Sequence, residues 1–265
     1  MNEVGREQHK HQILEQLVQM SCYLGAPGNE YVVLGEGNTS AKIDERTFYV
    51  KASGVSLTNI TSEGFVEVYS EPVLEMLKYE HLSDDEIQER LMDARVDPNC
   101  PYRPSVETVF HAMLLQLPNI NFVGHTHPTA LNSILCAKRS REPFMGHLFP
   151  EGIVCCGIAP VYVEYADPGV TLAKAIQRGV QEHLDTYGEP PKSILLENHG
   201  LIALGANPKE VETVTIMWDK IAKILLGTYM LGGPRFLTEE QVNRIWTRPD
   251  EKYRQKLIFE REGEA

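Results

Sequence analysis

The chain has 265 residues, of which 42% are hydrophobic and 23% charged, and its formal net charge at pH 7 is −12. That composition is ordinary for a globular protein, and the chain is long enough to bury a sizeable core. An acidic chain without a cluster of Lys and Arg argues against nucleic acid as the main partner. No apolar run reaches the roughly 18 residues that a membrane span needs, so we expect no membrane partner.

Cysteine usage and the polar N-terminus both point to the cytoplasm. The cysteine count is five, an odd number, and no two cysteines have Cys-x-x-Cys spacing. A disulfide framework is therefore not expected, and reduced thiols are typical of a cytoplasmic protein. Residues 1–10 are polar and lack the apolar core of a secretory signal. We expect a cytoplasmic location.

The N-terminal third begins with a helical pattern and continues with strand and turn patterns. Apolar residues between Glu7 and Leu24 recur on one helix face, and Gly25 is placed to end that helix. A loop of small residues follows at 35–40. Residues 47–51 indicate a strand that ends at a Ser53-Gly54 turn, and residues 65–69 alternate as an exposed strand would.

The middle of the chain predicts mostly helices. The polar segment from Glu71 to Pro104 holds a helix at 84–94 with a capping-box start, and it fits either a lid or a surface insertion. The following helix is expected from Ser105, as its N-cap, to Leu117. Three further helices are expected, at 128–137, at 168–184 and from Pro208 to near Gly232.

Two short strands within 193–204 meet at Asn198-His199-Gly200, and Thr238 begins a last helix. Helices and strands alternate irregularly, and neither a repeat nor a linker interrupts them. We therefore expect one α/β domain over 1–265, with a helical insertion at 71–103 and a C-terminal helical extension at 237–265.

Histidines are the most informative residues for chemistry. His125 and His127 follow an apolar strand pattern, and residues i and i+2 of a strand face the same side. His199 follows a second apolar run and precedes Gly200. Three imidazoles with one open position are a common arrangement for catalytic zinc. Spacing alone favours hydrogen-bonded structural histidines, and it does not place His199 beside the pair.

Glu107 and His111 form a second candidate pair, because they lie four residues apart on a predicted helix. A carboxylate near a helix start is favoured by the helix dipole alone, but a base held near a metal is the functional interpretation. His111 alone is more often a packing residue. Three small polar patches at 37–40, Ser53-Gly54 and Ser105 are ordinary turns unless they converge, in which case they would cradle a phosphate.

Together these motifs resemble the class II aldolase/adducin family, over residues 7 to 232. The residues that carry the resemblance are Gly37-Asn38-x-Ser40, Ser53-Gly54, Pro104-Ser105-x-Glu107, His125-x-His127-Pro128 and Asn198-His199-Gly200-Leu201. The resemblance implies a three-layer α/β/α fold around a mixed, largely antiparallel sheet. It also implies an aldolase that cleaves a ketose phosphate or related hydroxy-ketone through a zinc-stabilised enediolate.

The resemblance also implies roles for individual residues. His125, His127 and His199 match the ligands of Zn²⁺ or another divalent metal, and Glu107 matches the acidic residue that acts as base. The positions that hold the substrate phosphate in the family are matched by Asn38, Ser53, Gly54 and Ser105.

Three departures from the family pattern bear on these roles. Val106 replaces a frequent second Ser, which removes a hydroxyl from the phosphate pocket, and Lys51 is the candidate cation that compensates. The region of a Tyr proton donor in fuculose-phosphate aldolase holds His147 here, which makes His147 a candidate donor. The segment from Glu71 to Arg103 is longer than in compact aldolases, and it is similar to the aldolase part of rhamnulose-phosphate aldolase/dehydrogenase fusions.

Other functions on the same scaffold stay open, namely a sugar-phosphate 4-epimerase, a decarboxylase and a non-catalytic adducin-like interaction module. Epimerases that resemble the family tend to carry Asp at the position of Glu107, which favours cleavage. Adducin-like heads have lost metal ligands, whereas this chain keeps all three histidines. The family's aldolases are homotetramers with sites near the subunit interfaces. The apolar positions of the helix from Pro208 cover more than one face, which favours a homo-oligomer here.

Overall fold

The computed structural model describes residues 3–260, and its centre is a seven-stranded sheet with the order β3-β2-β1-β4-β7-β6-β5. The strands are β1 (Asn38–Lys42), β2 (Thr47–Lys51), β3 (Phe65–Tyr69), β4 (Phe122–Thr126), β5 (Val161–Val163), β6 (Ser193–Leu196) and β7 (Gly200–Gly205). All neighbouring strands pair antiparallel except β5 and β6, which pair parallel. The expected mixed, largely antiparallel sheet is confirmed.

The central strands β1, β4 and β7 bring distant parts of the sequence into one register. Asn38 on β1 lies opposite His125 on β4, and His125 in turn lies opposite Ile202 on β7. The turn from β6 to β7, which contains His199, therefore reaches the same end of the sheet as Asn38 and His125. This register explains why residues separated by more than 70 positions share one site.

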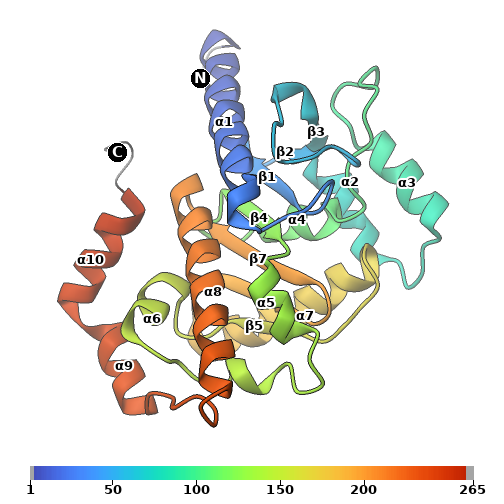
Figure 1. Cartoon of the computed structure of the whole chain (residues 1–265). Coiled ribbons are helices and arrows are strands. Elements are labelled where there is room, and N and C mark those ends of the chain that lie inside the picture. Colours follow the sequence, from blue (N-terminus) through green and yellow to red (C-terminus); the bar gives the residue numbers. More distant parts are fainter. Residues whose placement is uncertain (1–2, 261–265) are drawn as a thin grey trace.

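Helices cover both faces of the sheet, which gives the three-layer α/β/α architecture (Figure 1). One face packs against α1 (Glu3–Leu24), α5 (Thr129–Leu135), α6 (Pro150–Cys156) and α8 (Pro208–Tyr229). The other face packs against α2 (Ser70–Glu75), α3 (Asp84–Asp93), α4 (Thr108–Leu114) and α7 (Val170–Tyr187). Side chains alternate between the two cores along β7, where Leu201 and Ala203 face one core and Ile202 and Leu204 the other.

Two sequence predictions about local structure were wrong. Helix α4 begins at Thr108 and not at Ser105, and its N-cap residue is Glu107. Residues 105–108 form a turn instead, because the Ser105 hydroxyl accepts the Glu107 amide and the Ser105 carbonyl accepts the Thr108 amide. Strand β3 is an edge strand but not an exposed one, since the side chains of Val66 and Val68 are buried.

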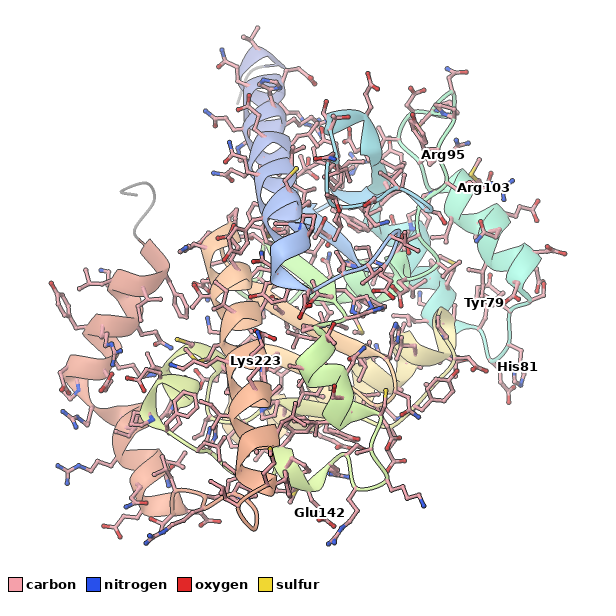
Figure 2. All side chains as sticks on the ribbon, viewed as in Figure 1. Tyr79, His81, Arg95, Arg103, Glu142 and Lys223 are labelled. Atoms are coloured by element: carbon pink, nitrogen blue, oxygen red, sulfur yellow. The ribbon has the colours of Figure 1, made fainter. Side chains whose placement is uncertain are left out.

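The segment from Glu71 to Pro104 was expected to be a lid or a surface insertion, and its apolar side chains are part of a core. Val73, Met76 and Leu91 are fully buried in the core that α4 and α7 share. Figure 2 shows Tyr79 and His81 before α3, and Arg95 and Arg103 on the loop beyond it. The loop after α3, the outer side of α3 and the stretch before α3 face solvent, because the polar residues of the segment gather there.

The C-terminal extension is helical, as expected, but it forms two helices. A Thr238 capping box starts α9 (Glu239–Thr247), and Pro249 starts α10 (Pro249–Glu260). The extension packs beside α6 and α8 (Figure 1), where Gln255 donates to the Val154 carbonyl. Residues 261–265 of the expected extension lie outside the described residues. Between residues 3 and 260, no helix has both the length and the apolar character needed to cross a membrane.

The packing of α1 on the sheet can be tested at Leu17. The Leu17 side chain on α1 is fully buried in the core between α1 and the sheet. Leu17→Ala should therefore lower the free energy of unfolding by about 2–5 kcal/mol, because burial is lost and a cavity is left. Urea denaturation followed by circular dichroism measures the change. Gln19→Ala, at an exposed position of the same helix, is the control and should change it by less than about 0.5 kcal/mol. Equal effects of the two substitutions would contradict the placement of α1.

Candidate functional site

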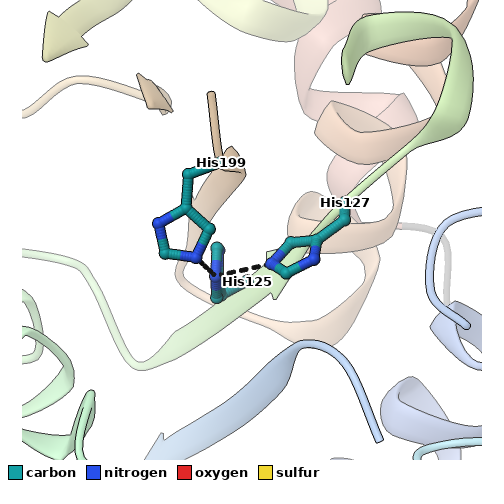
Figure 3. A group of neighbouring side chains, drawn as sticks. All are labelled: His125, His127 and His199. Atoms are coloured by element: carbon teal, nitrogen blue, oxygen red, sulfur yellow. Dashed lines mark hydrogen bonds between the residues drawn. The ribbon is translucent and has the colours of Figure 1, made fainter. Parts of the chain in front are cut away.

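Three histidine rings meet at the end of the central strands (Figure 3). The Nε2 atom of His125 lies 3.1 Å from Nε2 of His127 and 3.2 Å from Nε2 of His199. His125 and His127 come from the end of β4, on the same side of that strand, and His199 comes from the β6–β7 turn. The structure thus brings the three sequence-predicted ligands together, with their ligand atoms within 4.8 Å of one another.

The rings are held in place by the backbone around them. Nδ1 of His125 donates to the Leu201 carbonyl at 2.9 Å, so the proton of the neutral ring lies on Nδ1 and the Nε2 lone pair faces the cluster. Burial lowers the pKa of His125 to about 3, assisted by the neighbouring His199, and burial similarly lowers that of His127 to about 3. Both rings are therefore neutral near pH 7, which is the protonation state of a metal ligand.

The cluster has the chemistry of a metal site. One lone pair on His125 Nε2 cannot accept two linear hydrogen bonds, yet two ring nitrogens approach it closely. Zinc with tetrahedral Zn–N bonds of about 2.0–2.1 Å would separate its ligand nitrogens by roughly 3.3 Å. The observed separations of 3.1 and 3.2 Å are close to that value, so the residues fit a divalent cation.

Glu107 adds a carboxylate to the same cluster. Its Oε1 atom lies 3.4 Å from Nε2 of His199, and its Oε2 atom lies 3.6 Å from Nε2 of His125. The residue is only 8% exposed. A carboxylate beside three imidazoles can either ligate a metal or take a proton from a substrate bound there.

Two of the small polar patches meet at Glu107, and the third is tied to the segment that precedes it. Nδ2 of Asn38 donates to Glu107 Oε2 at 2.6 Å and lies 3.4 Å from the Ser105 hydroxyl. The turn at Ser53 and Gly54 is tied to the same segment, because the Ser53 amide donates to the Arg103 carbonyl at 2.8 Å. Gly54 adopts a φ of 78°, which favours glycine. Binding of a phosphate by these residues stays a prediction.

Lys51 places a buried cation beside the turn. Its Nζ atom donates to the Val55 carbonyl at 2.6 Å and to the Ala52 carbonyl at 3.3 Å. Burial lowers the pKa of Lys51 to about 8, and the negative charge of Glu107 opposes that shift. The lysine therefore stays largely charged at pH 7 and contributes positive potential on the side of Ser53. Its role in holding a substrate anion stays a prediction.

His147 lies elsewhere in the same subunit. Its ring donates from Nε2 to the Ile158 carbonyl at 2.7 Å, in a small cavity lined by Phe144, Trp218 and Ile221. Burial lowers the pKa of this imidazole. Its use as a proton donor, which would require a contribution from one subunit to another's site, stays a prediction.

Sequence reasoning missed two residues that hold His199. Nδ2 of Asn132 on α5 donates to the His199 carbonyl at 2.9 Å. Glu197 accepts from the Ser140 hydroxyl at 3.0 Å and from the Tyr165 amide at 3.0 Å, which fixes the entry to the β6–β7 turn. The Glu197-Asn198-His199-Gly200 motif contained a signal for Glu197, but nothing in the sequence connected Asn132 with it.

Comparison with known proteins identifies the family. Residues 16–226 match the family described as Class II Aldolase and Adducin N-terminal domain, so the chain belongs to the class II aldolase/adducin family. In structure it is similar to the N-terminal class II aldolase domain of a conserved Thermoplasma acidophilum protein, with 28% identity and a TM-score of 0.63 over 80% of this chain and 93% of that one.

Individual relatives differ in the activity that their names state. The chain is 31% identical to the uncharacterized oxidoreductase YuxG of Bacillus subtilis over 77% of its own length, but it spans only 28% of YuxG. It is 26% identical to 3-oxo-tetronate 4-phosphate decarboxylase of Haemophilus influenzae, over 82% of this chain and 89% of that protein. An L-fuculose 1-phosphate aldolase shares the fold, with a TM-score of 0.65 and 17% identity over 92% of this chain and 96% of that one.

The close approach of β7 to β4 provides a test of the metal site. A Cβ atom added to Gly200 would lie 2.4 Å from the Thr126 carbonyl oxygen and 2.7 Å from Cδ2 of His127. We expect the wild type to bind one divalent metal per chain, and Gly200→Ala to lower zinc affinity about 10-fold or more by displacing His127. Titration of chelator-treated protein with zinc measures both.

Gly227→Ala is the matched control, because a Cβ added to Gly227 on α8 meets no atom within 4 Å. It should leave zinc affinity unchanged. A wild-type stoichiometry near zero that added zinc cannot raise would contradict the metal site itself. Equal zinc affinity in the wild type and Gly200→Ala would contradict the importance of this strand contact.

Proposed function

We propose that the protein is a metal-dependent class II aldolase, a lyase that cleaves a carbon–carbon bond in a ketose phosphate or related hydroxy-ketone. The observation that carries the proposal is the position of Glu107, whose two carboxylate oxygens lie 3.4 and 3.6 Å from the ligand nitrogens of His199 and His125. A base beside a three-histidine cluster is the arrangement that such cleavage needs.

His125, His127 and His199 would hold the metal, Zn²⁺ or another divalent cation. When bound, the metal supplies Lewis-acid stabilisation of the negative charge that develops on the substrate oxygens. Glu107 moves the proton. As a carboxylate it takes the proton of a substrate hydroxyl, and the carbon–oxygen bond of that hydroxyl becomes a carbonyl as the neighbouring carbon–carbon bond breaks. The electron pair of that bond stays on the fragment that carries the original carbonyl.

The anionic end of the substrate would bind at the Ser53-Gly54 turn and Ser105. The turn carries the Ser53 hydroxyl, and the buried cation Lys51 donates to the Ala52 and Val55 carbonyls on either side of the turn. Lys51 would compensate for the hydroxyl that Val106 lacks. Charge complementarity of this kind supports a phosphate or a carboxylate as the bound group.

A decarboxylase is the second candidate. The relative that supports it is the Haemophilus influenzae 3-oxo-tetronate 4-phosphate decarboxylase, which this chain matches over most of both lengths. Loss of CO₂ next to a carbonyl leaves the same kind of negative charge as aldol cleavage, so the metal residues would serve both reactions. A panel of ketose 1-phosphates and 3-oxo sugar acid phosphates, assayed with zinc for aldehyde and for CO₂, separates the two candidates. Release of neither product would contradict both.

Glu107 can be tested directly on any substrate that the panel identifies. Glu107→Gln keeps the size and polarity of the side chain but removes the base, so turnover should fall roughly 10²-fold or more. Metal content and thermal unfolding are measured in parallel to show that the fold and the site survive. Turnover of the variant within a factor of two of the wild type would remove Glu107 from the proton transfer.

We also propose that the protein is a homo-oligomer, with a tetramer as the expected state. Within one subunit α1, α5 and α6 cover much of α8, which weakens the argument from its apolar positions, but three apolar side chains at its end stay exposed. These are Tyr229, Met230 and Leu231, with exposed fractions of 49%, 87% and 90%. A cluster of this kind favours an interface between subunits.

Light scattering at micromolar concentration measures the oligomeric state. The expected mass is a multiple of the 29.9 kDa chain, and Leu231→Asp should lower it by placing a charge in the interface. Tyr253→Asp, at a position of α10 that is 65% exposed, is the control and should leave the mass unchanged. A wild-type mass near 29.9 kDa with full activity would mean that each subunit builds its own complete site.

A further inference from the structure

Four buried side chains form a continuous chain of hydrogen bonds that ends at Glu107. The Ser40 hydroxyl contacts Nδ1 of His111 at 2.7 Å, and Nε2 of His111 contacts Oδ1 of Asn38. Nδ2 of Asn38 then donates to Oε2 of Glu107 at 2.6 Å. Ser40 and His111 are fully buried, and Asn38 and Glu107 are 4% and 8% exposed. Such contacts, shielded from water, constrain the side chains that make them.

The Glu107 carboxylate determines the direction of every hydrogen bond in this series of side chains. An ionised carboxylate only accepts hydrogen bonds, so the amide of Asn38 must turn its NH₂ group to Glu107 and its carbonyl oxygen to His111. That carbonyl also only accepts, so the proton of His111 must lie on Nε2. Nδ1 of the neutral ring is then an acceptor, and the Ser40 hydroxyl donates to it. Each donor therefore points toward Glu107.

The fold gives each member of the chain a fixed origin. Asn38 and Ser40 lie two residues apart on β1, so their side chains share a face of the sheet. His111 comes from α4, where its ring stacks on Phe110 with centroids 4.6 Å apart. The ring is neutral near pH 7, because burial lowers the pKa of His111 to about 3.

We propose that His111, held by Ser40, is a positioning residue for the reaction: it fixes the amide of Asn38 and thereby leaves Glu107 Oε1 as the oxygen that takes the proton. Glu107 Oε2 is engaged by Asn38, whereas Oε1 lies 3.4 Å from Nε2 of His199. The proposal rests on the proposed function for its catalytic meaning. It assigns Asn38 to the hydrogen bonds that orient Glu107, because the oxygen and the nitrogen of its amide both contact the protein's own side chains.

Substitution of His111 tests the catalytic part on a substrate from the panel. His111→Phe keeps an aromatic ring against Phe110 but frees the Asn38 amide, so kcat should fall about 10-fold or more while KM changes less than about threefold. His111→Gln can donate to Asn38 and accept from Ser40, so it should restore most of kcat. Zinc stoichiometry should stay at the wild-type value in both variants.

His183→Phe is the matched control, because His183 is a buried histidine on α7, away from the cluster. It should leave kcat unchanged. If His111→Phe does not fold, Ser40→Ala replaces it, with Ser21→Ala as its control, since both serines are fully buried and hydrogen-bonded. A kcat of His111→Phe or Ser40→Ala that equals that of its control would overturn the positioning role.

The direction of the chain can be tested without a substrate. In metal-free protein with ¹⁵N-labelled histidine, the ring signals that disappear in His111→Gln belong to His111. Their shifts should identify a neutral ring with its proton on Nε2. A proton on Nδ1, or a doubly protonated ring at pH 7, would overturn the proposal even if the protein is a lyase. Conversely, the protein could show the Nε2–H form and yet be inactive on the whole panel. That result would reject the proposed function, and the hydrogen bonds from Ser40 to Glu107 would then have no catalytic role.

Discussion

The pairing of β1, β4 and β7 is the constraint on which the site depends. Antiparallel register sets Asn38 opposite His125, and it sets Thr126 opposite Leu201, the second residue of β7. The backbone of Gly200 lies so close to Thr126 that a side chain there would collide with the strand and with His127. Close strand contact, and not a flexible loop, therefore determines the separation of the histidine nitrogens.

Burial then determines the electrostatics of the site. Desolvation disfavours charge on imidazole, which leaves the rings of His111, His125 and His127 neutral near pH 7. Glu107 is a buried carboxylate in contact with the cluster, and Glu36 lies 3.7 Å from Nδ1 of His127 at its exposed side. Lys51 is a nearby cation whose charge Glu107 supports against burial. Neutral nitrogens beside a carboxylate make a region that attracts a metal cation, while Lys51 makes a separate region that attracts an anion. In the proposed function, a substrate with an anionic end and a reactive carbonyl would suit both.

The sequence predicted the histidines and the glutamate that the structure brings together, but little of how they are assembled. Strand alternation placed His125 and His127 on one side of β4, and the spacing of the apolar runs marked His199 and Gly200. It could not place Glu107 correctly, because the Ser105 hydroxyl forms a turn where a helix N-cap was expected. Nor could it show that Val73 and Leu91 are buried, since the polar residues around them suggested a surface segment. Such outcomes are decided by contacts with distant elements, which local patterns do not contain.

The chemistry of the histidine cluster allows relatives on this fold to differ in activity. Aldol cleavage and decarboxylation both leave negative charge on oxygens next to a breaking carbon–carbon bond, so a histidine cluster with an oriented carboxylate can serve either reaction. The two reactions differ in the group that leaves, which is an aldehyde or CO₂. We expect that difference to fall to residues that contact the leaving group, and to any side chains that a second subunit contributes. The choice between these reactions is therefore expected to depend on the surroundings of the cluster more than on His125, His127, His199 and Glu107 themselves.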